Sequence, residues 1–326
     1  MKYLDKVYGP QEVKDKLALS IIKTKEMQRL KGVNQYGALK YITPWMTTTR
    51  FEHCLGVYSL LKRLGASREE QIAGLIHDIG HTAFSHVYDY VVGRLEEQDS
   101  NDEAQAGVVI NSEIRTLLLK EGIDTNFILT HKNFLLLEKE LPDLCADRID
   151  YILRDGLNYG AIQRDDIPPV LNSLKTDGKM IFLDDPSQAT KLSLLFMKMD
   201  EDYYRSAVQN AAYSLLGEAM RIALDKNIIS NDDFFDTDDF IINKLMNSRE
   251  KEVIKRIRLI NPNLKVREDK TDYDFFVKAR CRYITPLVLV GGAFKKISEI
   301  DRNLKKRIDI FKKEHARGRY IKIIWS

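Results

Sequence analysis

Four of the six histidines in this chain of 326 residues lie between residues 50 and 89: His53, His77, His81 and His86. A neutral imidazole is a common ligand for transition metals, whereas a charged one can bind phosphate or transfer protons. The adjacent pair His77 and Asp78 places a nitrogen ligand and an oxygen ligand on consecutive residues. This stretch is therefore the first candidate for a metal or phosphate site.

Two helices are predicted to carry this cluster. Apolar side chains recur every three or four residues from 51 to 64, which is typical of a helix, and Gly65 closes it. Ser67 and Glu70 have the spacing of a capping box, so a second helix begins there and ends near Gly80.

His53 then lies in the middle of the first helix, and His77 and Asp78 lie in the last turn of the second. Two antiparallel helices joined by a short turn could bring these three side chains together. A fourth ligand must come from elsewhere in the chain.

A third helix is predicted over residues 144 to 155. Asp147, Tyr151 and Asp155 follow one another at i, i+4 and i+8, so they share one stripe of this helix. The stripe suits a pocket wall, with Asp147 near a cation and the other two side chains reaching a polar ligand. It suits a solvated surface equally well.

Composition places few limits on function. The hydrophobic fraction of 44% is ordinary for a globular protein, and a formal net charge of +3 does not by itself imply a nucleic-acid partner. The three cysteines are widely spaced, which favours a reducing compartment and hence a cytoplasmic protein. No apolar run is long enough for a membrane span or resembles a signal peptide.

Two domains are expected, residues 1 to 228 and residues 229 to 326, with the acidic stretch 231–240 near the boundary. A long helix is predicted from Thr190 to about Asn227. Strand-like runs between residues 273 and 290 precede a helix with a basic face within residues 295 to 322. Such a face is usually just solvated, but it is also a candidate contact for nucleic acid, nucleotide or another subunit.

Four sequence blocks resemble those of the HD-domain metal-dependent phosphohydrolases. RFEH at 50–53, AGLIHDIGHTAFSH at 73–86 and DRIDYILRD at 147–155 are most similar to the deoxynucleoside triphosphate triphosphohydrolases, including SAM-and-HD-domain and dGTPase-like enzymes. MQRLKGVNQYG at 27–37 resembles the segment that precedes the first histidine in those enzymes. The resemblance implies a mainly α fold, with an HD-domain helical bundle core and a smaller α+β C-terminal part.

The resemblance also implies a divalent metal ion held by four side chains: His53, His77, Asp78 and Asp147. Two imidazoles and two carboxylates suit Mn, Fe, Co, Ni, Zn or Mg without choosing among them. A metal with open positions polarises a phosphoryl oxygen and lowers the pKa of a bound water.

Further residues receive roles through the resemblance. His81, His86 and Asp89 match positions that contact phosphate or assist proton transfer. Arg50 and Arg148 match basic positions beside phosphate.

Gln35, Tyr151 and Asp155 match positions that hold the sugar of a deoxynucleotide. These matches imply hydrolysis of a nucleotide, and we expect a homo-oligomer.

One position departs from the family pattern. The triphosphohydrolases usually carry a further histidine in a His-Glu pair, where this chain has Asp102 and Glu103. A second hypothesis therefore stands beside the enzyme: a regulatory protein that senses a nucleotide in the HD pocket and engages RNA or a protein through its basic C-terminal part. The complete ligand set favours the enzyme, because a sensor needs no open metal position.

Overall fold

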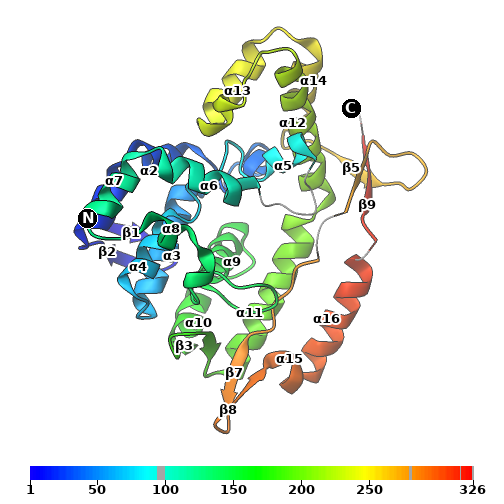
Figure 1. Ribbon diagram of the computed structural model, residues 1–326. Coiled ribbons are helices and arrows are strands. Elements are labelled where there is room, and N and C mark those ends of the chain that lie inside the picture. The colour runs from blue at the N-terminus through cyan, green and yellow to red at the C-terminus, as the bar shows by residue number, and fades with distance from the viewer. Residues whose placement is uncertain (94–99, 279–280, 316, 325–326) are drawn as a thin grey trace.

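The computed structural model describes residues 1–93, 100–278, 281–315 and 317–324 (Figure 1). Up to residue 228 its helices are α1 (Lys16–Lys23), α2 (Lys25–Arg29), α3 (Arg50–Arg63), α4 (Arg68–Ile76), α5 (Val87–Val92), α6 (Ser100–Ile110), α7 (Glu113–Lys120), α8 (Thr125–Leu129), α9 (Ala146–Tyr159), α10 (Ile167–Ser173), α11 (Pro186–Met199) and α12 (Ala207–Asp225). Beyond it lie α13 (Asp238–Asn247), α14 (Lys251–Leu259), α15 (Ile297–Ile300) and α16 (Arg302–His315).

The strands are short and form three small sheets: β1 (Lys2–Asp5) with β2 (Gly9–Glu12); β3 (Leu174–Thr176), β4 (Ile181–Leu183), β7 (Leu287–Val290) and β8 (Ala293–Lys296); and β5 (Val266–Glu268), β9 (Arg319–Ile323) and β6 (Phe275–Val277). Helices dominate, and strands of the C-terminal third contribute to two of these sheets. The expected fold class, a helical HD core with a smaller α+β C-terminal part, is confirmed.

The two helices predicted around the histidine cluster are present and pack against each other as α3 and α4. Thr49 caps α3 through a reciprocal capping box with Glu52, and Gly65 follows the helix in the left-handed region at φ +72°. Ser67 caps α4 by accepting a hydrogen bond from the Glu70 amide. The Glu70 carboxylate does not complete a capping box with Ser67.

The carboxylate of Glu70 instead accepts the amides of Leu136 and Leu137, at 2.6 and 3.0 Å. It therefore fixes a turn in the irregular segment that leads into α9. In this way the start of α4 helps to set the position of the third helix of the site.

The single long helix expected from Thr190 to Asn227 is wrong. α11 ends at Met199, a π-helical turn follows over Asp200–Tyr204, and α12 begins after Ser206. Ser206 adopts an extended backbone conformation, so the helical backbone is interrupted there. Its side chain accepts a hydrogen bond from the amide of Gln209 and so caps the N-terminus of α12. Single π-helical turns are frequent at functional sites.

Segments on both sides of residue 228 share the same apolar cores. Val288, Leu304 and Ile308 lie in one buried cluster with side chains of α3, α4 and α9, and β7 pairs in parallel with β4. Phe234 and Val253 pack in a second cluster with side chains of α12. Figure 1 shows α13 and α14 beside that helix. The domain boundary after residue 228 stays a prediction.

The basic segment forms two helices rather than one, because Asp301 ends α15 and its side chain accepts the amides of Asn303 and Leu304 at the start of α16. Ile297, Leu304 and Ile308 are buried, whereas Ile300 is exposed. A nucleic-acid contact through this segment and a homo-oligomer both stay predictions. Among the described residues, no helix is both long and apolar enough to cross a membrane.

Candidate metal centre and substrate pocket

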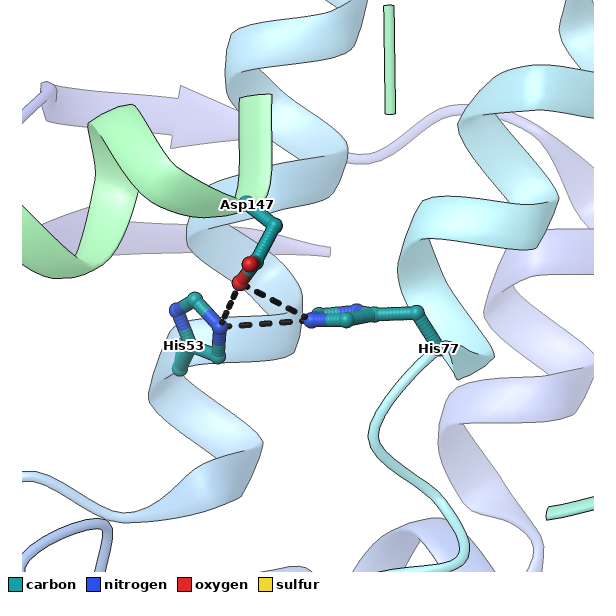
Figure 2. Close-up of side chains that lie close together, drawn as sticks. All are labelled: His53, His77 and Asp147. Carbon is teal, nitrogen blue, oxygen red and sulfur yellow. Dashed lines mark hydrogen bonds and ion pairs between the residues drawn. The ribbon is translucent and has the colours of Figure 1, made fainter. Parts of the chain in front are cut away.

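Three helix ends converge on the candidate metal centre (Figure 2). His53 lies in the first turn of α3 rather than in its middle, His77 caps the C-terminus of α4, and Asp147 lies in the first turn of α9. Side chains at helix ends can converge because the backbone changes direction there. The predicted meeting of two histidines from adjacent helices with an aspartate from a distant helix is therefore present in the structure.

The three side chains offer one ligand atom each, all within 4.8 Å of one another. His53 Nε2 lies 2.9 Å from Asp147 Oδ1 and 3.2 Å from His77 Nε2, and His77 Nε2 lies 3.5 Å from the same carboxylate oxygen. Two imidazole nitrogens and a carboxylate oxygen form a donor set that suits a divalent transition metal.

Both imidazole rings are oriented through their other nitrogen. His53 Nδ1 lies 2.7 Å from the carboxylate of Asp150, and His77 Nδ1 lies 2.7 Å from the carbonyl oxygen of Gly74. Each of these oxygens accepts a hydrogen bond, so in the neutral rings Nδ1 carries the proton and Nε2 presents a lone pair. When both rings are neutral, the three converging atoms are all Lewis bases, which suits a cation between them. Without a cation, protons on the histidines supply the positive charge.

Asp150 was not singled out from the sequence, although it has a clear supporting role. Its carboxylate receives two hydrogen bonds from Arg154, at 2.8 and 2.9 Å, and Arg154 also reaches Asp5 of β1 at 3.0 Å. Asp150 and Arg154 are almost completely buried, and Asp5 is 4% exposed. The sequence feature that could have revealed Asp150 is its spacing, three residues after Asp147 and four before Arg154. This spacing puts charges on a helix face that packs against α3.

The ionisation of the cluster follows from the same contacts. Burial by itself would lower the pKa of His53, but hydrogen bonds to Asp147 and Asp150 raise it to about 9. The charge of Asp78 and the bond to Asp147 likewise hold the pKa of His77 above its usual value against burial. Burial opposes ionisation of Asp147, yet its two histidine partners keep its pKa well below the ordinary range. Positive charge is strongly favoured at this point.

Asp78, the fourth expected ligand, lies beside the three converging atoms. Its two oxygens are 3.5 Å from His77 Nε2 and 3.7 Å from His53 Nε2. The same carboxylate receives a 2.7 Å hydrogen bond from Arg50 and lies 3.1 Å from His81 Nε2. It is therefore within reach of a cation in this cluster while it also holds two other predicted site residues.

A cavity of about 850 Å³, counted with its open mouth, adjoins the metal cluster. Part of this volume is open solvent at the mouth, and the lining combines charged, polar and aromatic side chains. Aromatic side chains dominate its wall: Tyr36, Tyr90, Tyr151, Tyr203, Tyr204 and Tyr213. Tyr203, Tyr204 and Arg205 come from the π-helical turn and the break before α12, so the interruption of the long helix supplies part of the pocket.

The expected sugar-binding residues are neighbours in this cavity. Gln35, Tyr151 and Asp155 all line it, and Gln35 Nε2 donates to Asp155 at 3.1 Å. The hydroxyl of Tyr204 donates to the other oxygen of Asp155 at 2.8 Å. Burial raises the pKa of Asp155 to about 6. The stripe on α9 is thus a pocket wall rather than a solvated surface.

His81, His86 and Asp89 form a second polar group next to Asp78. The rings of His81 and His86 meet edge to face with centroids 5.2 Å apart, and His86 lines the cavity. Its Nδ1 lies 3.5 Å from the carboxylate of Asp89, which is fully buried. Burial and the charge of Arg50 lower the pKa of His81 to about 3, so this ring is neutral near neutral pH.

The expected basic residues have different surroundings. Arg50 lines the cavity beside Asp78 and donates to Ser85 Oγ at 3.0 Å. Arg148 lies outside the lining of this cavity, because its guanidinium donates to the carbonyl oxygens of Lys139 and Asp143 and so holds the segment ahead of α9. Arg148 is therefore corrected from a phosphate contact to a residue that supports the start of α9.

Two other arginines, Arg205 and Arg282, line the cavity instead. Arg205 follows the π-helical turn, and Arg282 comes from the last third of the chain, where no sequence motif marked it. The side chains of Asp102 and Glu103, where the family pattern has a further histidine, lie outside the described residues.

These features define the class. Residues 50 to 155 match the family model of the HD domain, and the histidines and aspartate that converge here lie within that match. The chain belongs to the HD-domain family of metal-dependent phosphohydrolases.

Among its relatives, the uncharacterized protein YdhJ of Bacillus subtilis is 35% identical over 325 residues, which is 99% of each chain. The metal-dependent phosphohydrolase cns2 of Cordyceps militaris is 31% identical over 66% of this chain and 64% of its own. The deoxynucleoside triphosphate triphosphohydrolase SAMHD1 homolog of Dictyostelium discoideum is 33% identical over 28% of this chain and 20% of its own. The expected family and its divalent metal are confirmed.

Substitution of Asp150 by asparagine tests the support behind His53. We expect metal affinity to fall about 10- to 100-fold, because the imidazole loses the charged acceptor that orients it and increases its basicity. Titration of the metal-free protein with Mn²⁺ and Zn²⁺ measures the change. Asp165→Asn, an exposed carboxylate, is the matched control. Equal affinities in the two variants would contradict the role of Asp150.

The metal-free protein should lose stability as pH rises from about 6.5 to 9. His53 has a raised pKa in the folded state, so its contribution is complete below pH 6.5 and disappears as pH passes 9. Urea unfolding of chelator-treated protein should show a decrease of roughly 1–3 kcal/mol across this window. The decrease should shrink in His53→Gln, and a flat profile in the unmodified chain would show that His53 is not charged there.

Proposed function

We propose that this protein hydrolyses a phosphoester or phosphoanhydride bond of a nucleotide, with (deoxy)nucleoside triphosphates as its preferred substrates. The observation that carries the proposal is the convergence of His53 Nε2, His77 Nε2 and Asp147 Oδ1 at the edge of a cavity lined by tyrosines, arginines and Asp155. His53 belongs both to the metal cluster and to the lining of that cavity, so a ligand in the cavity lies next to the cation.

His53, His77, Asp147 and Asp78 are the residues that would hold the metal ion. A bound divalent cation supplies Lewis-acid polarisation of a phosphoryl oxygen and a water of lowered pKa. Asp150 and the Gly74 carbonyl keep both imidazoles in the tautomer that presents Nε2.

His86 is assigned to proton transfer at the reacting phosphate. It lines the cavity, and the buried carboxylate of Asp89 beside its Nδ1 favours a proton on that nitrogen, which leaves Nε2 free to exchange one. His81 stays neutral and holds Asp78 in place. Arg50, which already pairs with Asp78, adds positive charge on the phosphate side of the cavity.

The nucleoside end of the substrate is assigned to Gln35, Tyr151 and Asp155. The carboxylate of Asp155 is buried in a polar arrangement with Gln35 and Tyr204, which suits a sugar hydroxyl. The surrounding tyrosines offer flat apolar faces for a sugar and a base, and Arg205 and Arg282 add charge for further phosphates. A relative named as a deoxynucleoside triphosphate triphosphohydrolase supports this substrate class.

The decisive experiment is a substrate screen with Mn²⁺ on nucleoside mono-, di- and triphosphates, with product identification. Turnover should disappear in Asp147→Ala, and bound metal should fall, while the far-ultraviolet helical signal is retained. Asp165→Ala, an exposed carboxylate, should behave as the unmodified protein. Retained turnover in Asp147→Ala would refute the site, and tight nucleotide binding without any turnover in the unmodified protein would favour the sensor hypothesis.

Asp155→Asn separates nucleotide recognition from phosphate chemistry. We expect KM for a nucleotide substrate to rise about tenfold, because a charged acceptor for a substrate hydroxyl is lost. The kinetics with p-nitrophenyl phosphate, which has no sugar, should change little. Steady-state kinetics on both substrates measure the difference, and an equal loss on both would place Asp155 in the phosphate chemistry rather than at the sugar.

A further inference from the structure

The loop between α4 and α5 carries His81 and His86, and its backbone needs outside support. Phe84 and Ser85 have φ values of +60° and +52°, in the left-handed region that residues with side chains rarely adopt. Two such residues in succession persist only where surrounding contacts impose the conformation.

Asp238, in the first turn of α13, provides one of these contacts. Its carboxylate is completely buried. One oxygen accepts the amide of Phe84 at 2.7 Å, and the other accepts the amide of Asn34 at 3.0 Å and Lys40 Nζ at 3.1 Å. A single side chain from beyond residue 228 thus connects the His81–His86 loop to the loop that carries Gln35.

The residues just before Asp238 contact the same loop. The carbonyl oxygen of Phe234 accepts the amide of Ala83 at 2.8 Å. Arg29 donates to the carbonyl oxygens of His81, at 2.7 Å, and of Asp236, at 3.2 Å. The segment from Phe234 to Asp238 therefore holds the loop at several points along its length.

The supported conformation reaches the site through Ser85. Its hydroxyl accepts the 3.0 Å hydrogen bond from Arg50 Nε and donates to the carbonyl oxygen of Asn34 at 2.8 Å. Asp238 and Ser85 thus join the same two loops at one point, called the loop junction here. Asp238 accepts the amides of Asn34 and Phe84. Ser85 donates to the Asn34 carbonyl oxygen and accepts from Arg50. Because Arg50, His86 and Gln35 are all attached to the loop junction, we expect its displacement to move them together.

We propose that Asp238 is a positioning residue for the phosphohydrolase reaction: it fixes the His81–His86 loop and the Gln35 loop relative to each other, without contact to metal or substrate. This inference rests on the proposed function for the roles of His86 and Gln35. Asparagine cannot replace the carboxylate, because its amide has one acceptor oxygen and would face two backbone N–H groups and a lysine. At least one loop then loses its anchor.

The test compares Asp238→Asn with Asp239→Asn in the full chain. Asp239 is the adjacent, largely exposed carboxylate, and Lys40 lies 3.6 Å from it, so the control removes the same charge from the same turn. Lys40→Met removes the ion pairs of Lys40 with Asp238 and Asp239 and its cation–π contacts, and leaves both amide hydrogen bonds of Asp238 in place. Kinetics are measured with the best nucleotide from the screen, per mole of metal-loaded protein and well below the unfolding midpoint of each variant.

We expect kcat/KM of Asp238→Asn to fall about 10- to 100-fold with unchanged Mn²⁺ content. A small displacement of a catalytic group is enough for a loss of this size. Both kcat and KM should change, because His86 and Gln35 are displaced together. Asp239→Asn and Lys40→Met should stay within about threefold of the unmodified protein. A lower unfolding midpoint with unchanged kcat/KM would reduce Asp238 to a structural residue and overturn the inference.

Amide hydrogen exchange gives a readout that does not need turnover. The amides of Phe84 and Asn34 should exchange about tenfold faster in Asp238→Asn than in Asp239→Asn. The reason is that asparagine offers one acceptor oxygen, so one amide loses its acceptor or both share it. Unchanged protection at both amides would overturn the inference even if the protein is an active phosphohydrolase. Faster exchange in a protein that hydrolyses no nucleotide would instead support the anchoring and refute the proposed function.

Discussion

Three ligand atoms, His53 Nε2, His77 Nε2 and Asp147 Oδ1, approach one another closely. The positive charge that this approach requires, from a cation or from protons on the histidines, is the constraint on which the rest of the site depends. Each atom is held in place from behind: His53 by Asp150, His77 by the Gly74 carbonyl, and Asp147 by the start of α9. These supports lie on α4 and α9, so the arrangement is stable only when the helices are packed and positive charge lies among the three atoms. The candidate cation site is therefore formed by packed helices rather than by a flexible surface loop.

The cavity beside this centre has a different origin. The metal ligands come from regular helix ends, whereas much of the cavity wall comes from the place where a long helix is interrupted. The π-helical turn and the cap at Ser206 bring Tyr203, Tyr204 and Arg205 to the pocket and place the Tyr204 hydroxyl against Asp155. Three carboxylates on α9 therefore serve three purposes: Asp147 belongs to the metal cluster, Asp150 supports a histidine, and Asp155 faces the cavity.

Sequence patterns were sufficient where a local rule decides the structure. The spacing of apolar residues and the capping residues placed α3 and α4, and the family blocks indicated which side chains meet. Local rules failed at the π-helical turn, because Met199, Tyr203 and Ala207 keep the helical spacing through it. They also failed at Asp301, whose side chain splits the basic helix. Arg148 could not be assigned correctly from sequence, since the carbonyl oxygens that hold it come from an irregular segment. Asp150 and Arg282 needed three-dimensional contacts to be recognised.

The order of these contacts along the chain affects how the protein emerges from the ribosome. All histidines of the HD motif are synthesised early, yet the acceptor for the Phe84 amide lies more than one hundred residues later, in Asp238. A nascent chain that has reached only the end of α12 already contains the metal ligands but lacks the group that fixes the loop between α4 and α5. That loop therefore cannot gain its Asp238 anchor until α13 has been synthesised.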